Sequence, residues 1–241
     1  MRARLVLVLL MLVAIVPCGV AGELSFDAAF TPEDFADLTE VLADTVAFPN
    51  LGPAEPGGLM GFEVLAAAGG ARADEGDRYW EHGIDGDTVL GTLSGSRAIA
   101  RKGLPGHLDL GAQLGKVLGE RFWGGELRWA LLEGGNVSPA LALRATYSRL
   151  DNAPIDLEVA EAQVVLSKGF LILTPYGALG YRKASASAFF GDPAPRTHEV
   201  DRDGVTATVG LRISPLPFIR VVAEVRQGFG TSYFVGFGVG L

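Results

Sequence analysis

Apolar and polar residues alternate with a period of two between residues 59 and 241, in segments about ten residues long. In the segment 205–213, for example, Val205, Val209 and Ile213 share one face, while Thr206 and Arg212 share the other. Successive side chains of a β-strand point to opposite faces, so this period predicts strands. We count ten such segments, with eight or twelve as the neighbouring possibilities, and expect no helix among them.

The connections between these segments predict how the strands are joined. Tight links at 103–106, 134–138, 168–169 and 214–217 alternate with longer ones at 70–92, 115–122, 150–156 and 185–201, and with a short one at 228–232. Transmembrane β-barrels have short turns at one end and longer loops at the other. The pattern therefore predicts an all-β fold, a closed antiparallel up-and-down transmembrane barrel over residues 59–241 with both of its ends on the short-turn side.

One helix is expected before the strands, within a segment that covers residues 22–58. Thr31 is a candidate N-cap, because Pro32 follows it at a position where proline is well tolerated and acidic residues occupy the first turn. Phe35, Leu38 and Leu42 then recur at helical spacing. These features predict a short amphipathic helix over about 32–45.

Residues 1–21 have the features of a secretory signal peptide. A basic start is followed by an apolar run from Leu5 to Val16, and small residues precede a cleavage site after Ala21. The run is shorter than the ~20 residues that span a bilayer as a helix. Cys18 is the only cysteine, so the processed chain has no disulfide and depends on its core or on a closed sheet for stability.

Composition and charge narrow the choice of function. Glycine, at 33 of 241 residues, has about twice its usual share. The net charge of −8 argues against nucleic-acid binding, which requires a basic face. High hydropathy without a second long apolar stretch means that the apolar residues are distributed in alternation.

The last segment carries a resemblance to a known class of proteins. It alternates apolar residues and glycine, and the chain resembles Gram-negative outer-membrane β-barrel proteins, of the small OmpA/OmpX-like or porin-like type. This resemblance implies an outer-membrane location, with lipid and lipopolysaccharide as neighbours. It also implies the barrel-assembly machinery and periplasmic chaperones as partners during biogenesis. The residues that match the assembly signal are Tyr233, Val235, Phe237, Val239 and Leu241, with leucine in place of the more usual final phenylalanine.

The inward face of the predicted barrel carries charges of both signs. The candidate lumen-lining residues are Asp109, Glu126, Arg128, Arg144, Glu161, Arg212, Arg220, Glu224 and Arg226. A narrow barrel is largely filled by side chains, which favours a structural or surface barrel with a packed polar lumen. The alternatives are a small-solute pore or transporter with an Arg/Glu-lined lumen, and a secreted soluble β-sandwich. The helix could plug the lumen or stay in the periplasm, and its acidic residues could face the luminal arginines.

No motif indicates catalysis, and we expect neither an enzyme nor a cofactor. His82, His107 and His198 fall in or near predicted loops and turns, and no G-x-S-x-G sequence provides a nucleophile. The acidic clusters lack the spacing of a calcium loop, so no metal site is expected.

Overall fold

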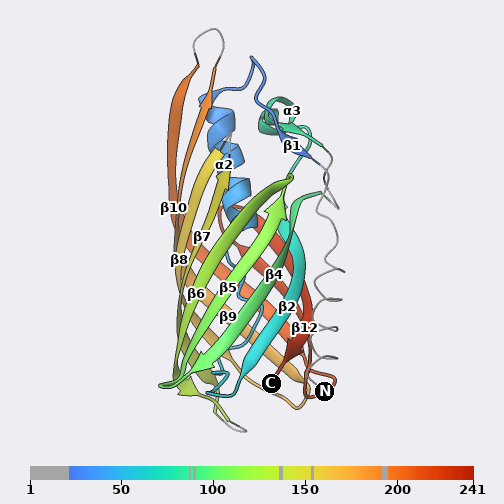
Figure 1. Cartoon of the computed structure of the whole chain (residues 1–241), viewed down its shortest axis with the longest axis vertical. Helices are drawn as coiled ribbons and strands as arrows, with labels where there is room; N and C mark the ends of the chain where they lie inside the picture. The colour runs from blue at the N-terminus through green and yellow to red at the C-terminus, as the bar shows by residue number, and fades with distance from the viewer. Residues whose placement is uncertain (1–21, 87, 89–90, 136–137, 153–154, 192–194) are drawn as a thin grey trace.

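The computed structural model describes residues 22–86, 88, 91–135, 138–152, 155–191 and 195–241, so the predicted signal peptide lies outside it. Ten antiparallel strands form one closed barrel (Figure 1). They are β2 (Phe62–Arg72), β4 (Thr92–Leu104), β5 (Leu108–Val117), β6 (Glu120–Glu133), β7 (Ala140–Asn152), β8 (Ile155–Ser167), β9 (Leu173–Phe190), β10 (Arg196–Ile213), β11 (Ile219–Gln227) and β12 (Thr231–Gly240). Each strand pairs with its neighbour in the chain.

The barrel closes by pairing its last strand with its first. In β12, Phe237 stands opposite Ala66 of β2, and Val239 opposite Val64. Where all ten strands pair, the closed sheet leaves no free edge. A β-structure in a lipid bilayer needs this property, because lipid offers the backbone no hydrogen bonds. The predicted barrel of ten antiparallel strands is confirmed, and the alternative of a two-sheet sandwich is wrong.

The links between the strands are shorter at several places than the sequence pattern predicted, and the strands there are longer. Most of the expected links at 115–122 and 150–156 is strand, because β5 to β8 extend further than expected, and only residues 118 and 119 lie between β5 and β6. The region 185–201 is mostly strand, since β9 and β10 have 18 residues each and rise above their neighbours (Figure 1). The end that carries this hairpin and residues 73–86 is called the loop end below, and the opposite one the short-turn end.

Residues 78–85 form regular structure where none was expected. The short helix α3 (Arg78–Gly83) is followed by β3 (Ile84–Asp85), which pairs with β1 (Glu23–Leu24). The expectation of no helix after residue 59 was wrong, because a helix of six residues is too short to show a helical period. The pairing with β1 places Glu23 and Leu24 at the loop end.

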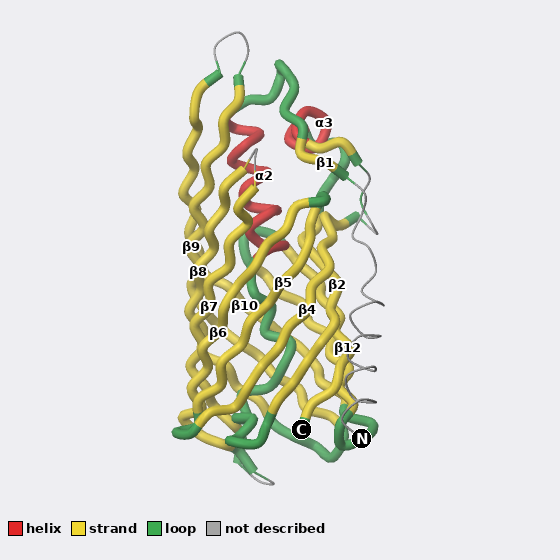
Figure 2. Tube along the Cα trace, viewed as in Figure 1, coloured by secondary structure: helices red, strands yellow, loops and turns green. Residues whose placement is uncertain are grey.

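The predicted N-terminal helix is α2 (Pro32–Val46), which lies inside the barrel at the loop end (Figures 1 and 2). Thr31 accepts a hydrogen bond from the backbone N–H of Asp34, and the Asp34 side chain accepts one from the backbone of Thr31, which together form a capping box. Phe35, Leu38 and Leu42 are fully buried. Neither helix in the described part of the chain is long and apolar enough to cross a membrane.

Apolar packing holds the start of this segment at the loop end. Phe26 stacks on Phe30 at 4.5 Å between ring centroids, and Phe35 meets Phe190 of β9 edge to face at 5.5 Å. The same cluster includes Leu38, Leu42 and buried residues of several strands. The helix is therefore anchored to the extended β9–β10 hairpin as well as to the lumen.

Candidate functional site: the occupied lumen

Residues 47–56, called the strap below, continue from α2 through the lumen towards the short-turn end. Figure 2 shows this segment as an irregular trace inside the barrel between α2 and β2. Phe48, Leu51 and Ala54 have no exposed surface, and Asn50 has 1%. The segment before β2 thus fills the interior, and the lumen is the place where charged side chains of the wall meet the rest of the chain.

The C-terminal end of α2 is bound by side chains of the barrel wall. The helix has no basic residue in its last turn, yet the last carbonyl groups of a helix need donors and carry partial negative charge. Arg226 donates to the Asp44 carbonyl at 2.7 Å, and Arg97 donates to the carbonyls of Thr45 and Ala47. The wall therefore supplies the cations that the helix itself lacks.

Arg97 has no carboxylate partner among the described ion pairs. Its guanidinium lies 4.9 Å from the ring centroids of both Phe122 and Phe234, and it donates to Gln113 at 3.1 Å. Two aromatic faces and the helix carbonyls together stabilise this buried cation. Arg97 consequently couples the wall to the helix end without forming a salt bridge.

A buried ion-pair cluster fixes the last turn of α2. The Asp44 carboxylate accepts hydrogen bonds from Arg182 and from the backbone N–H of Gly230, the latter at 2.6 Å. Arg182 also donates to Glu161 at 3.0 Å, and Thr206 donates to Glu161 at 2.5 Å. Two carboxylates and one arginine without exposed side-chain surface therefore satisfy one another across the helix and strands β8, β9 and β10.

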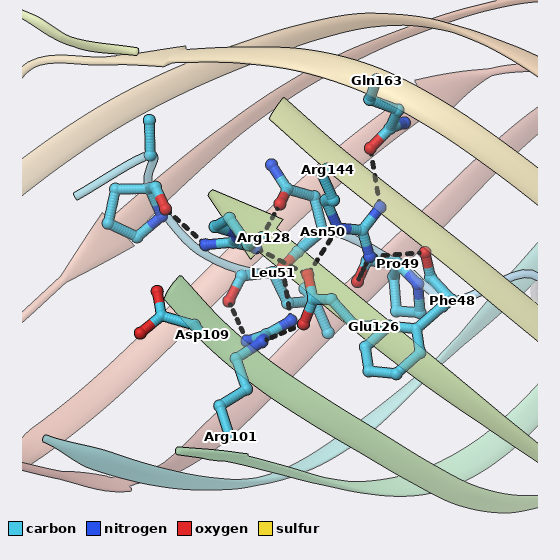
Figure 3. A network of polar contacts seen from close by, with 12 residues as sticks. Phe48, Pro49, Asn50, Leu51, Arg101, Asp109, Glu126, Arg128, Arg144 and Gln163 are labelled. Atoms are coloured by element: carbon cyan, nitrogen blue, oxygen red, sulfur yellow. Dashed lines mark hydrogen bonds and ion pairs between the residues drawn. The ribbon is translucent and has the colours of Figure 1, made fainter. Parts of the chain in front are cut away.

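Glu126 is the centre of a second cluster, nearer the short-turn end (Figure 3). Its two oxygens accept hydrogen bonds from Arg101 at 2.6 Å, Arg128 at 2.8 Å and Arg144 at 2.5 Å. All four side chains are at most 7% exposed. Such an arrangement is stable only if the remaining donors also find partners, because buried charges carry a large desolvation cost.

The backbone of the strap provides those partners. Arg144 donates to the carbonyls of Phe48 and Pro49 at 3.0 Å each, and Arg101 donates to the carbonyl of Asn50 at 2.6 Å. Further contacts along the strap are Arg128 to Pro53 O, Glu224 to the N–H groups of Asn50 and Leu51, and Ser167 to Ala54 N–H. Directly after the strap, the Gly57 N–H donates to Asp109. The wall thus binds the strap through its peptide groups.

The nine candidate lumen residues do not all lie in one place. Seven of them are buried in the interior: Asp109, Glu126, Arg128, Arg144, Glu161, Glu224 and Arg226. Arg212 lies nearer the mouth and donates to Glu63 at 3.0 Å. Arg220 is at the short-turn mouth, where it donates to the backbone carbonyls of Pro217 and Ile219.

Sequence reasoning missed several residues of the network. Arg97, Arg101 and Gln113 lie on the inward faces of β4 and β5, and Arg182 on that of β9. Of the acidic residues of α2, Asp44 pairs with Arg182 and Glu40 with Arg202. The period of two could have identified Arg97, which lies between Ser96 and Ala98, whereas Arg101 and Arg182 are each followed by an exposed lysine that obscures the alternation. The strap residues show no period at all.

The last strand presents Tyr233 and Phe237 outward and buries Phe234. Tyr233, Val235 and Phe237 are about half exposed on the outer surface, opposite a face of serine, Phe234 and glycines. A Cβ at Gly238 would overlap the carbonyl oxygen of Val64 and crowd Leu65, whereas one at Gly236 would meet only ordinary contacts at 3.6 Å. Glycine at position 238 is therefore required by the neighbouring strand β2.

The histidines are dispersed. His82 contacts Asp27 at 2.8 Å, His107 contacts Glu133 at 3.1 Å, and the His198 ring stacks on Phe190. Within the described ranges, no group of three or more His, Cys, Asp or Glu side chains could hold a metal ion. The lumen network remains the site with the most buried charge.

Comparisons with known proteins find similar folds at low similarity. No family model matches the chain, and no curated protein matches it. The N-terminal β-barrel domain of Pseudomonas aeruginosa OprF aligns with a TM-score of 0.41 at 12% identity, over 76% of this chain and 97% of that one. The outer-membrane protease OmpT of Escherichia coli gives 0.43 at 11% identity, over 74% and 92%. Ail, the attachment invasion locus protein of Yersinia pestis, gives 0.37 at 13%, over 78% and 99%. The chain is thus similar to outer-membrane β-barrels, and its family is not identified.

Proposed function

We propose that this protein is an integral outer-membrane β-barrel whose lumen is closed by its own N-terminal segment, and that it acts as a structural or surface barrel. The observation that carries this proposal is the binding of the strap by the wall. Arginine and carboxylate side chains from strands around the barrel hold peptide groups of Phe48, Asn50, Leu51 and Pro53 in the strap, and of Gly57 directly after it. A solute could pass only if these buried hydrogen bonds were broken together.

The outer surface supports a membrane location. Leu114, Leu179, Val205 and Val209 are 66–71% exposed, and Trp129 and Phe237 are about half exposed on the same outer face. A soluble protein rarely exposes so much contiguous apolar surface, whereas a transmembrane barrel turns such a band towards lipid. Lipid and lipopolysaccharide are therefore the expected neighbours, and the last strand is the expected contact of the assembly machinery and its chaperones.

The orientation follows from the turns. In bacterial barrels the short turns face the periplasm and the longer loops face outward. The loop end, with α3, β1 and the β9–β10 hairpin, would then be extracellular. The segment from Gly22 would start outside the cell and run through the lumen to the periplasmic mouth.

The alternative function is a small-solute pore lined by arginine and glutamate. A pore would require α2 and the strap to move out of the lumen. Most of the hydrogen bonds of the wall arginines to these two segments would then be lost. We propose no catalytic role, because the candidate residues of the lumen pair with one another and with the backbone.

Conductance of the full processed chain in a planar bilayer tests the proposal. A closed barrel gives no steady channels at moderate voltage, and insertion is verified in parallel by the heat-modifiable band of the same preparation. Steady channels whose conductance changes in the Arg144→Glu variant would instead support the pore.

A further inference from the structure

Part of strand β10 has a free edge at the loop end. β10 pairs with β9 over its whole length, from Arg196 to Ile213, but with β11 only from Ala207 to Ile213. In the described part of the chain no strand pairs with the other edge of residues 196–206, and Figure 1 shows the β9–β10 hairpin rising above its neighbours. The backbone N–H and C=O groups of such an edge are available to another strand.

A cavity of about 610 Å³ lies beside this edge, between α2, residues 71–79 and the turn that joins β11 to β12. One hydrogen bond and one close approach connect the cavity to the free edge. Arg202 donates to Glu40, which lines the cavity, at 2.8 Å. A Cβ at Gly204 would lie 3.7 Å from the ring of Phe229, which also lines it.

The lining of the cavity is strongly acidic. It contains the carboxylates of Glu33, Asp34, Asp37, Glu40, Asp44, Asp74 and Asp77, and the guanidinium groups of Arg72 and Arg78 only. Seven acidic side chains therefore face two basic ones. A concave surface of one charge sign concentrates ligands of the opposite sign.

Only some of these carboxylates have cationic partners. Asp34 pairs with Arg78, and Glu40 and Asp44 pair with arginines of the wall. No ion pair to Glu33 or Asp37 is present among the described residues. Burial raises the pKa of the Asp37 carboxyl, Arg202 opposes this, and the nearby carboxylates of Asp34 and Asp77 raise it further. The cavity thus has negative charge that the protein itself does not compensate.

We propose that an extended polypeptide segment with lysine or arginine at alternating positions binds here by adding as a strand to residues 196–206 of β10. Strand addition to a free sheet edge is an established mode of peptide recognition. The added strand would continue the line of β11 upward, so its inward side chains would point at the acidic residues of α2. Lysine or arginine at alternating positions shares one face of a strand, here the inward one, and the residues between them would lie outward, opposite Glu199, Asp201 and Asp203.

Charge also argues against a second copy of this chain as the occupant. A symmetric antiparallel pair of β10 edges centred at Asp201 sets Glu199 opposite Asp203 and Asp201 opposite itself. Shifting the centre to Val200 sets Glu199 opposite Asp201. Like charges directly opposite each other destabilise a strand pair, so a basic partner fits this edge better than β10 does.

The inference rests on the proposed function only in placing this surface outside the cell. The probe is a fluorescein-labelled ten-residue peptide of alternating lysine and threonine, titrated into the full processed chain in lipid nanodiscs. A second peptide has the same sequence but N-methylated backbone nitrogens, so that it retains its charge and cannot pair with a strand edge. We expect saturable binding of the first peptide, weakened by salt, and binding of the second that is at least tenfold weaker.

Matched variants locate the site. Replacing two cavity carboxylates, Glu33→Gln with Asp37→Asn, should weaken binding roughly threefold to tenfold, as expected for two partly exposed charge contacts. Glu23→Gln with Glu81→Gln removes the same charge at the loop end, outside the cavity lining, and should leave binding unchanged. Equal binding of both peptides, or equal weakening by both double variants, would overturn the inference. The heat-modifiable band reports barrel folding separately, so a failure of the barrel itself would be recognised.

Discussion

Replacing Glu126 with glutamine should destabilise the barrel far more than the loss of an exposed charge does. Glu126 accepts hydrogen bonds from Arg101, Arg128 and Arg144, and its side chain is 2% exposed. The glutamine amide would direct two donors at guanidinium groups that can only donate. Arg128 and Arg144 would also lose the only carboxylate to which they are ion-paired among the described residues.

The size of the effect follows from this geometry. Removing one partner from a buried ion cluster costs about 3–5 kcal/mol, because charges remain buried without compensation. Arg101 keeps Glu63 at 2.9 Å, which limits the loss at one of the three arginines. Glu158→Gln is the matched control, since Glu158 pairs with Arg149 at 3.1 Å with 45% of its side chain exposed. Such a surface pair contributes less than about 1 kcal/mol.

Equilibrium unfolding in lipid vesicles measures both variants, with the heat-modifiable band as the folded signal across a urea series. Hydrogen exchange of peptides from residues 47–56 adds a local readout, because the same arginines hold the strap. We expect a lower midpoint and faster exchange of the strap for Glu126→Gln, and near wild-type behaviour for Glu158→Gln. Equal midpoints for the two variants would refute the reasoning that this network stabilises the plugged lumen.

Three further predictions concern the outer face, the helix start and the orientation. Phe237→Asp places a charge on the lipid face at a cost of up to roughly 2–4 kcal/mol and should sharply reduce the heat-modifiable band. Gly236→Ala has room for a Cβ and should leave the band unchanged. The reverse result would mean that the inward and outward faces of β12 are exchanged. Burial would raise the pKa of Asp34, but hydrogen bonds from Thr31 and Arg78 lower it below the ordinary 3.8. Its contribution to stability is therefore complete above that value and is lost as the pH falls through the folded pKa, so an NMR titration midpoint above 3.8 would contradict the capping geometry. An epitope inserted after Gly22 should be accessible to antibody on intact cells, and detection only after permeabilisation would show that the loop end faces the periplasm.

The sequence predicted the barrel because alternation in a strand is a local property. The apolar side chains of Val205, Val209 and Ile213 indicate by themselves which face of the strand they share. The same period places Glu126 and Arg144 inward, and no information about the neighbouring strands is needed. The start of α2 was predictable for the same reason, since Thr31 and Pro32 act within one turn.

The plug was only one of two open possibilities, because its contacts join distant parts of the chain. Arg144 binds the carbonyl of Phe48, and Arg97 binds that of Ala47. Every residue has a backbone carbonyl, so the residue types in 47–56 do not indicate that arginines bind there. The crowding at Gly238 likewise comes from residues that are distant in the sequence, Val64 and Leu65 of β2.

The most direct test of the plugged lumen is a disulfide between α2 and the wall. The Cγ2 atom of Thr45 lies 3.6 Å from the position that a Cβ at Gly95 would take, so the side chains of cysteines at the two positions would lie next to each other. In outer membranes, the Thr45→Cys/Gly95→Cys chain should form this bond and migrate as a cross-linked species on a non-reducing gel. The control pairs Thr45→Cys with Ser94→Cys, which lies on the opposite face of β4, and should remain reduced. Absence of the Thr45–Gly95 bond, or equal cross-linking of both pairs, would show that α2 does not occupy the lumen.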